Sequence, residues 1–212
     1  MAERALTVPD PTDRDDLAQF VGRAVRLDPH GLVRLRAKSE GRVGAWATTG
    51  FDAVAARSVP GELTPPDTTV NAADLLTALA VQRGAAVDPG FAVDAAWRSA
   101  LPPEGGLEHV DDVPEHILVQ MSEQGVALAR EHAGPHGPPA SLLDSVVLTV
   151  RGGRQTVGVP LRCVFALAGM GFIGEGGEEP VRVRASAGWL RLDARFGSVL
   201  RRRHPQIPLL IR

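Results

Sequence analysis

The stretch Gly31–Leu79 reads GLVRLRAKSEGRVGAWATTGFDAVAARSVPGELTPPDTTVNAADLLTAL, and its residue pattern is the clearest indication of the fold class. Apolar and polar residues alternate through it, which is typical of strands whose sheet has one packed face and one wet face. We expect three strands here, over Leu32–Ala37, Arg42–Thr48 and Phe51–Val59. Asn71 and Asp74 then mark the start of a short amphipathic helix that ends near Gly84.

The flanking segments are predicted in the same way. The proline-rich residues 61–68 (GELTPPDT) read as a loop. Upstream, Thr12 and Asp15 form a start signal of the capping-box type for a helix over about 13–26. We expect residues 1–12 to be a loosely held tail. Downstream, Phe91–Trp97 suits either a strand or a short helix, and Leu101–Gly106 (LPPEGG) suits a linker.

A second series of elements follows the linker. Asp112 and Glu115, with Pro114 between them, predict a helix that runs to about His132. The later segments predict a hairpin, a buried helix, a second hairpin and a terminal edge strand, over Val146–Val150 with Gln155–Val159, Pro160–Gly169, Val181–Ala187 with Trp189–Ala194, and Ile207–Ile211.

The order helix, strands, short helix, strands therefore occurs twice, with the long helices starting about 100 residues apart. We interpret the chain as an α+β protein of two similar halves with mainly antiparallel sheet, 13–103 and 104–212, packed as one compact unit. An internal duplication explains this order, and so does the chance recurrence of a common α+β arrangement. The sequence alone leaves both explanations open.

Residues 31–79 resemble part of a bacterial DNA sliding-clamp domain. The resemblance rests on paired strands, the Gly-containing loop at Pro60-Gly61, and Val70-Asn71-Ala72 followed by Leu75-Leu76. It implies a clamp-like architecture. A processive clamp also needs a closed ring with a basic lining and three such domains per subunit. This chain has 212 residues and a net charge of −2, so the resemblance does not extend to clamp function.

The composition indicates the kind of genome that encodes the protein and the cellular location to expect. Of 23 basic residues only Lys38 is a lysine, and this bias towards Arg, with abundant Ala, Gly and Pro, indicates a GC-rich bacterial genome. The first 30 residues lack the apolar core of a signal peptide, and no apolar run approaches the roughly 20 residues of a membrane span. With Cys163 as the single cysteine, no internal disulfide can form. We therefore expect a cytoplasmic protein with no membrane partner.

The densest group of candidate metal ligands is His109, Asp111, Asp112 and His116. Zinc sites use three or four His, Cys or carboxylate ligands, and a loop could fold these four around a metal. The simpler interpretation is that Asp112 and Glu115 cap a helix and that the two histidines are surface imidazoles. No established ligand spacing, nucleophile motif or cofactor fingerprint is present, so we expect no cofactor.

The arginines near the C-terminus are the other candidate site. Arg182 and Arg184 share one side of a predicted strand, and Arg191 with Arg201, Arg202 and Arg203 extends the basic character. Such a stripe could bind an acidic partner or phosphates. A solvated sheet face in an Arg-rich protein is the simpler explanation, since base recognition would need interleaved aromatic residues and only Trp189 and Phe196 are available.

These patterns favour a non-enzymatic protein-interaction or binding module. The alternatives are a clamp-like protein associated with nucleic acid, and an enzyme with a site near His109, Asp111 and His116. A protein is the expected partner, nucleic acid is the less supported one, and association with a second copy stays open.

Overall fold

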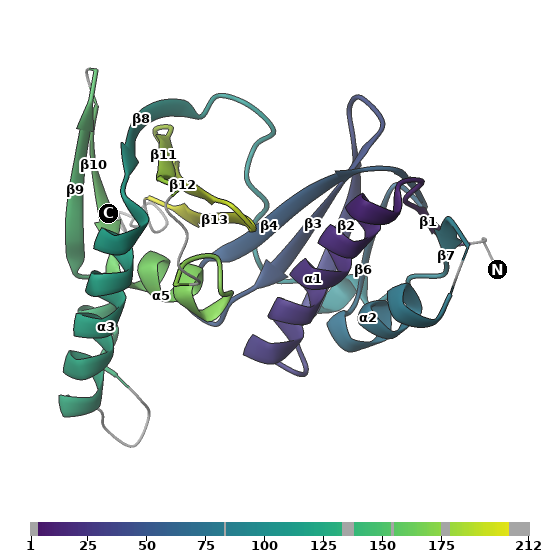
Figure 1. Ribbon diagram of the computed structural model, residues 1–212, viewed down its shortest axis with the longest axis horizontal. Helices are drawn as coiled ribbons and strands as arrows, with labels where there is room; N and C mark the ends of the chain where they lie inside the picture. The colour runs from purple at the N-terminus through teal and green to yellow at the C-terminus, as the bar shows by residue number, and fades with distance from the viewer. Residues whose placement is uncertain (1–3, 83, 133–137, 154, 175–178, 204–212) are drawn as a thin grey trace, which may run out of the picture.

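The computed structural model describes residues 4–82, 84–132, 138–153, 155–174 and 179–203 (Figure 1). In chain order the elements are β1 (Ala5–Thr7), α1 (Pro11–Leu27), β2 (Leu32–Lys38), β3 (Arg42–Thr48), β4 (Val54–Pro60), β5 (Glu62–Thr64), β6 (Asp67–Asn71), α2 (Ala72–Val81), β7 (Ala86–Val87), the 3₁₀ turn Asp94–Ala96, β8 (Glu108–Val113), α3 (Glu115–Glu131), α4 (Ala140–Asp144), β9 (Val146–Gly152), β10 (Gln155–Pro160), α5 (Leu161–Gly169), β11 (Val181–Ala185), β12 (Trp189–Ala194) and β13 (Gly197–Arg202).

One antiparallel sheet of eight strands runs through both halves in the order β6-β2-β3-β4-β13-β12-β11-β8. Its alternating sequence gives it two different faces. Val33 and Leu35 are fully buried on the inner face, where α1 and α2 cover the first half (Figure 1). Val183 and Leu192 lie on the same inner face in the second half, within the core that includes α5. Basic residues such as Arg34 and Arg184 therefore lie on the outer face.

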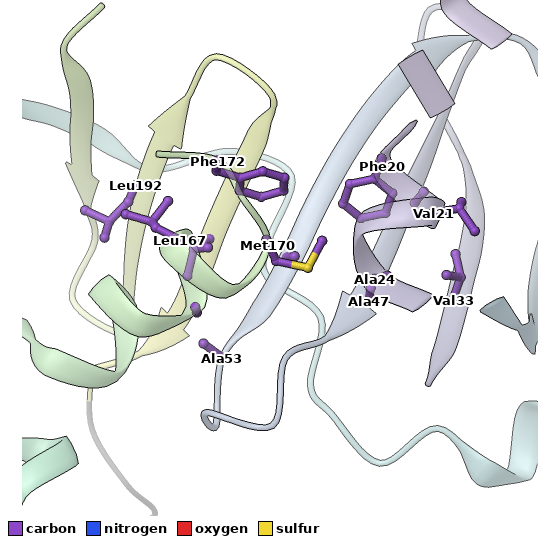
Figure 2. Close-up of a cluster of buried hydrophobic side chains, with 14 of the residues drawn as sticks. Phe20, Val21, Ala24, Val33, Ala47, Ala53, Leu167, Met170, Phe172 and Leu192 are labelled. Atoms are coloured by element: carbon purple, nitrogen blue, oxygen red, sulfur yellow. The ribbon is translucent and has the colours of Figure 1, made fainter. Parts of the chain in front are cut away.

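The two halves meet where β4 pairs with β13. Ala56, Ala55 and Val54 stand opposite Ser198, Val199 and Leu200 respectively. Beneath this pair the inner core is continuous, as Figure 2 shows with Met170 lying between the halves. Phe20 of α1 stacks on Phe172 of the second half with ring centroids 6.3 Å apart. The halves therefore share one sheet and one core.

Three arginines carry hydrogen bonds across this junction. Arg23 of α1, itself only 7% exposed, donates to the carbonyl of Gly171 and lies over the ring of Phe196 at 4.3 Å. Arg57 of β4 pairs with Asp16 and donates to the Arg195 carbonyl at 3.2 Å. Arg162 of α5 donates to the Phe51 carbonyl at 3.2 Å. At this junction, arginine side chains thus donate to backbone carbonyls that would otherwise need hydrogen bonds from water.

The structure confirms the α+β class and the two similar halves, each with a long helix, strands, a short helix and further sheet. The strands predicted over Leu32–Ala37 and Arg42–Thr48, both predicted hairpins and the buried helix α5 are present within a residue or two. The segment Phe91–Trp97 contains a single 3₁₀ turn. No helix among the described residues is long and apolar enough to cross a membrane.

The helix start at Asn71 is confirmed, but the capping residues predicted for the two long helices were wrong. Helix α1 begins at Pro11, and the side chain of Asp10 accepts from the Thr12 amide at 2.7 Å, so Asp10 takes the capping role assigned to Thr12. Asp112 belongs to strand β8 and caps nothing. Glu115 is buried because its carboxylate accepts from the Gly174 amide at 2.8 Å. Tertiary partners override the local capping signal in the second case.

Six strands were missed, namely β1, β5, β6, β7, β8 and β13, and most of them are short or lie in a polar stretch. Residues 61–68 contain β5 and the start of β6, and the expected tail contains β1, whose Leu6 is fully buried between β5 and β7. Strand β13 was also overlooked, and no element was predicted for its residues. The predicted terminal strand Ile207–Ile211 lies outside the described residues.

Gly197→Ala is expected to lower the free energy of unfolding by about 1–3 kcal/mol, because overpacking a closed core costs that much. An added Cβ would lie 2.5 Å from the Phe172 ring and 3.0 Å from the Ala56 carbonyl of β4. Urea unfolding of both proteins measures the difference. Gly188→Ala is the control, since nothing lies within 4 Å of its added Cβ. Equal stability of both variants would contradict the tight fit of this junction.

Candidate binding face at the junction

A linker crosses the outer face of the sheet at the junction. Between the 3₁₀ turn and β8, Trp97 and Leu101 pack with the outer-face residues Trp46, Val54 and Leu200 in a small apolar cluster of their own. In Figure 1 this segment passes on the side of the sheet away from α1. The linker therefore covers the outer face only at its centre.

The residues in and just before the 3₁₀ turn close one edge of the sheet. The carboxylate of Asp94 accepts from the Thr69 amide of β6 at 2.5 Å, and the Val93 amide donates to the Thr69 carbonyl at 2.7 Å. These bonds satisfy the groups that an edge strand would otherwise offer to another chain.

Two hollows lie beside the linker, and Leu200 contributes to both. The first, which we call the junction hollow, has a volume of about 360 Å³. Residues of both halves and of the linker line it: Thr48, Thr49, Gly50, Asp52, Ala53, Val54, Arg98, Ser99, Ala100, Trp189, Leu200, Arg201 and Arg202. It is open to solvent and needs no rearrangement of the sheet to admit a side chain.

The second hollow, which we call the basic cleft, has a volume of about 290 Å³. Its lining comprises Lys38, Arg42, Gly44, Trp46, Ala56, Arg57, Ser58, Pro102, Pro103, Glu104, Arg191, Ala194, Gly197, Ser198 and Leu200. Gly44 is required beneath it, because an added Cβ would lie 2.3 Å from the Trp46 indole that folds over this strand. The lining thus combines four basic residues with the buried indole of Trp46, and these residues are Lys38, Arg42, Arg57 and Arg191.

The outer face carries three of the candidate arginines, and each has an acidic neighbour. Arg182 binds Asp112 at 3.1 Å, and Arg191 binds Asp193 at 2.6 Å. Arg184, which stands opposite Arg191, lies 3.3 Å from the same Asp193 carboxylate. This part of the stripe is therefore largely neutralised by the protein itself.

The remaining three candidate arginines do not continue that row. Arg201 lies on the inner face of β13, and one of its guanidinium nitrogens lies 3.1 Å from both Asp52 and Asp144. Arg203 donates to the Ser186 carbonyl at 2.8 Å. Arg202 lies over the Trp189 ring at 5.8 Å and has no ion pair among the described residues. Within the described ranges, Arg202 therefore lines the junction hollow without a carboxylate partner.

The candidate metal ligands are spread over two elements. His109 and Asp112 of β8 form a pair at 2.9 Å, and Asp112 also accepts from Arg182. Arg182 first, and then His109, hold the pKa of Asp112 below its ordinary value. His116 lies on α3, and Asp111 accepts only the amide of its neighbour at 2.9 Å. Across the described ranges no three His, Cys, Asp or Glu side chains gather as a metal site.

Sequence reasoning missed the basic cleft. Lys38 and Arg42 lie at the turn end of the β2–β3 hairpin, on the side of the strands that faces outward. A signal was present, because they continue the alternation set by Arg34 and Arg36. What the sequence could not show is that the linker and β13 would enclose them.

Comparisons with known proteins agree with this arrangement. Residues 1–99 and 102–206 match two family models, each described as a domain of unknown function (DUF8010 and DUF8185). The boundary between the two matches falls in the linker. No curated protein sequence matches the chain.

Among solved structures the fold is similar to that of bacterial DNA sliding clamps. A Bartonella birtlesii clamp bound to griselimycin shares 14% identity at a TM-score of 0.57, with 97% of this chain and 66% of that chain covered. A Bacillus subtilis clamp shares 13% identity at a TM-score of 0.58, with 98% of this chain and 66% of that chain covered. A Helicobacter pylori clamp bound to a DNA ligase peptide shares 8% identity at a TM-score of 0.53, with 99% of this chain and 70% of that chain covered. The clamp-like fold is thereby shown, and this chain spans about two thirds of a clamp chain.

Cys163 is expected to be unreactive in the folded protein. It is 1% exposed, and burial raises the pKa of its thiol to about 12. At pH 8 the thiolate fraction is then about 10⁻⁴, against about a quarter for a free cysteine. A disulfide reagent such as DTNB should label it only in denaturant. Labelling of the native protein at the denatured rate would contradict this burial.

Proposed function

We propose that the chain is a non-enzymatic binding module that holds an extended segment of a partner protein on its outer face. The junction hollow is the seat of this interaction. The observation that carries the proposal is that the first half, the linker and the second half all line this one hollow. A site composed in this way exists only in the assembled pair of halves, 13–103 and 104–212, which we propose as the two domains.

The similar clamp structures support a peptide as the ligand class. One was solved with a DNA ligase peptide, so this fold has held a peptide ligand in another protein. The hollow here offers the mixture that peptide sites use. Val54, Ala100 and Leu200 provide apolar wall, while Thr48 and Arg202 provide polar groups at the rim.

The charges on the helices argue against binding along a nucleic acid. Strongly exposed charged residues on α1, α2, α3 and α5 comprise four carboxylates and two cations: Asp15, Asp74, Glu123 and Glu131 against Arg26 and Arg130. A phosphate backbone needs a continuous basic surface to displace its counterions. The helical face is net acidic, and aspartates interrupt the basic sheet face.

Ala100→Arg is expected to weaken peptide binding at least tenfold, because a long charged side chain would fill the junction hollow. Peptides are first selected from a random display library against the whole chain, and their dissociation constants are then measured on each variant. Ala127→Arg on α3 is the matched control, since Ala127 is also exposed and lies far from the hollow in sequence and on another face.

Two results would overturn the proposal. One is a set of selected peptides that bind both variants and the parent equally. The other is tight, steeply salt-dependent binding of a 30-base-pair DNA duplex that exceeds any peptide affinity, which would favour the nucleic-acid alternative.

A further inference from the structure

We infer that the basic cleft is a carboxylate-binding subsite, which takes an acidic side chain of the partner segment. The subsite rests on the proposed function in that the same segment would run from the junction hollow into the cleft. Leu200 forms part of both walls, and the linker contributes Ala100 to the junction hollow and Pro102 to the basic cleft. The predicted partner is therefore an extended peptide with an aspartate or glutamate beyond its apolar anchor.

Lys38 and Arg42 are the cations that make the subsite. They stand directly opposite each other on β2 and β3, an arrangement that is unfavourable for like charges. Among the described residues the Arg42 side chain donates only to Ser58, to its hydroxyl at 3.2 Å and to its carbonyl at 2.7 Å. Neither cation has a carboxylate within ion-pair distance among the described residues. An anion placed between them would relieve the repulsion.

The neighbouring charges limit the size of the anion. On one side Arg34 holds Asp67 through two hydrogen bonds of 2.8 Å, and on the other Arg191 holds Asp193. These aspartates end the positive potential on both flanks of the cleft. A polyanion such as DNA would meet them within a few residues, whereas one or two carboxylates fit between them. Charge complementarity therefore favours a short acidic segment.

The linker already shows that a glutamate fits this place. Glu104 lies in the wall of the cleft after Pro102 and Pro103, which keep the linker extended. Its carboxylate is not within 4 Å of either cation, so it screens them without pairing. A partner carboxylate would compete with Glu104 for the same field. Removing the charge of Glu104 should then strengthen binding, which a general surface effect would not do.

Lys38 provides a specific probe because it is the only lysine in the chain. Reductive methylation with ¹³C-formaldehyde labels Lys38 and the terminal amine and preserves the charge of both. Titration with hexaglutamate at low salt should shift the Lys38 methyl signal in a saturable way and leave the terminal signal unchanged. Inorganic phosphate and a 30-base-pair duplex serve as competing anion classes.

Affinity for hexaglutamate should fall at least about tenfold in Lys38→Gln/Arg42→Gln, as expected for loss of two charge-assisted contacts. The control Arg26→Gln/Arg130→Gln removes the same net charge from exposed helix positions and should change it less than about twofold. Lys38→Gln alone, which removes no recorded hydrogen bond, replaces the double variant if that variant unfolds. Glu104→Gln should tighten binding about threefold, while Glu123→Gln on α3 should not.

The inference fails if both double variants weaken binding equally, if Glu104→Gln has no effect beyond that of Glu123→Gln, or if DNA saturates the Lys38 signal more tightly than hexaglutamate. Ala100→Arg separates this inference from the proposed function. It should leave hexaglutamate binding unchanged, because Ala100 lines only the other hollow. Loss of peptide binding with an intact hexaglutamate site would therefore refute one proposal and keep the other.

Discussion

The pairing of β4 with β13 is the constraint on which the rest of the molecule depends. Three residues of each strand stand opposite each other, and through them two separate sheets become one sheet of eight strands. A shared sheet must have its inner face covered without a gap, which brings Met170 and Phe172 against α1. It also brings carbonyls of one half within reach of arginines of the other, and two of these, Arg23 and Arg162, are among the few buried charged residues in the described part of the chain.

The same pairing determines what the outer face can do. Strands from both halves lie side by side there, so the linker must cross them to reach β8, and its tryptophan and leucines pack on the apolar centre of the face. What remains uncovered on either side is a hollow. The candidate site is therefore a consequence of joining the two halves, and each half alone would present only part of its walls.

Strand alternation and helix periodicity in the sequence predicted the elements that are amphipathic, such as β2, β3 and α5. They could not predict β1, β5 and β8, because short or edge strands obtain their stability from neighbours that are distant in sequence. Glu115 illustrates the limit at a single residue: its local pattern indicated a cap, while its partner is 59 residues away. The basic residues of the site were visible, but which of them aspartates neutralise depends on cross-strand register.

The strand that each half gives to the junction is one that the other half does not have. β4 is the third strand after α1, whereas only β9 and β10 follow α3 before α5 in the part of the chain that the structure describes. β13 is the third strand after α5, whereas only the two-residue β7 lies between α2 and the linker in that same part. A head-to-tail contact propagates into a ring or a filament only when every unit carries both complementary surfaces. Here β4 and β13 are already paired with each other within one chain, so this particular contact leaves no strand free to repeat it with a second chain.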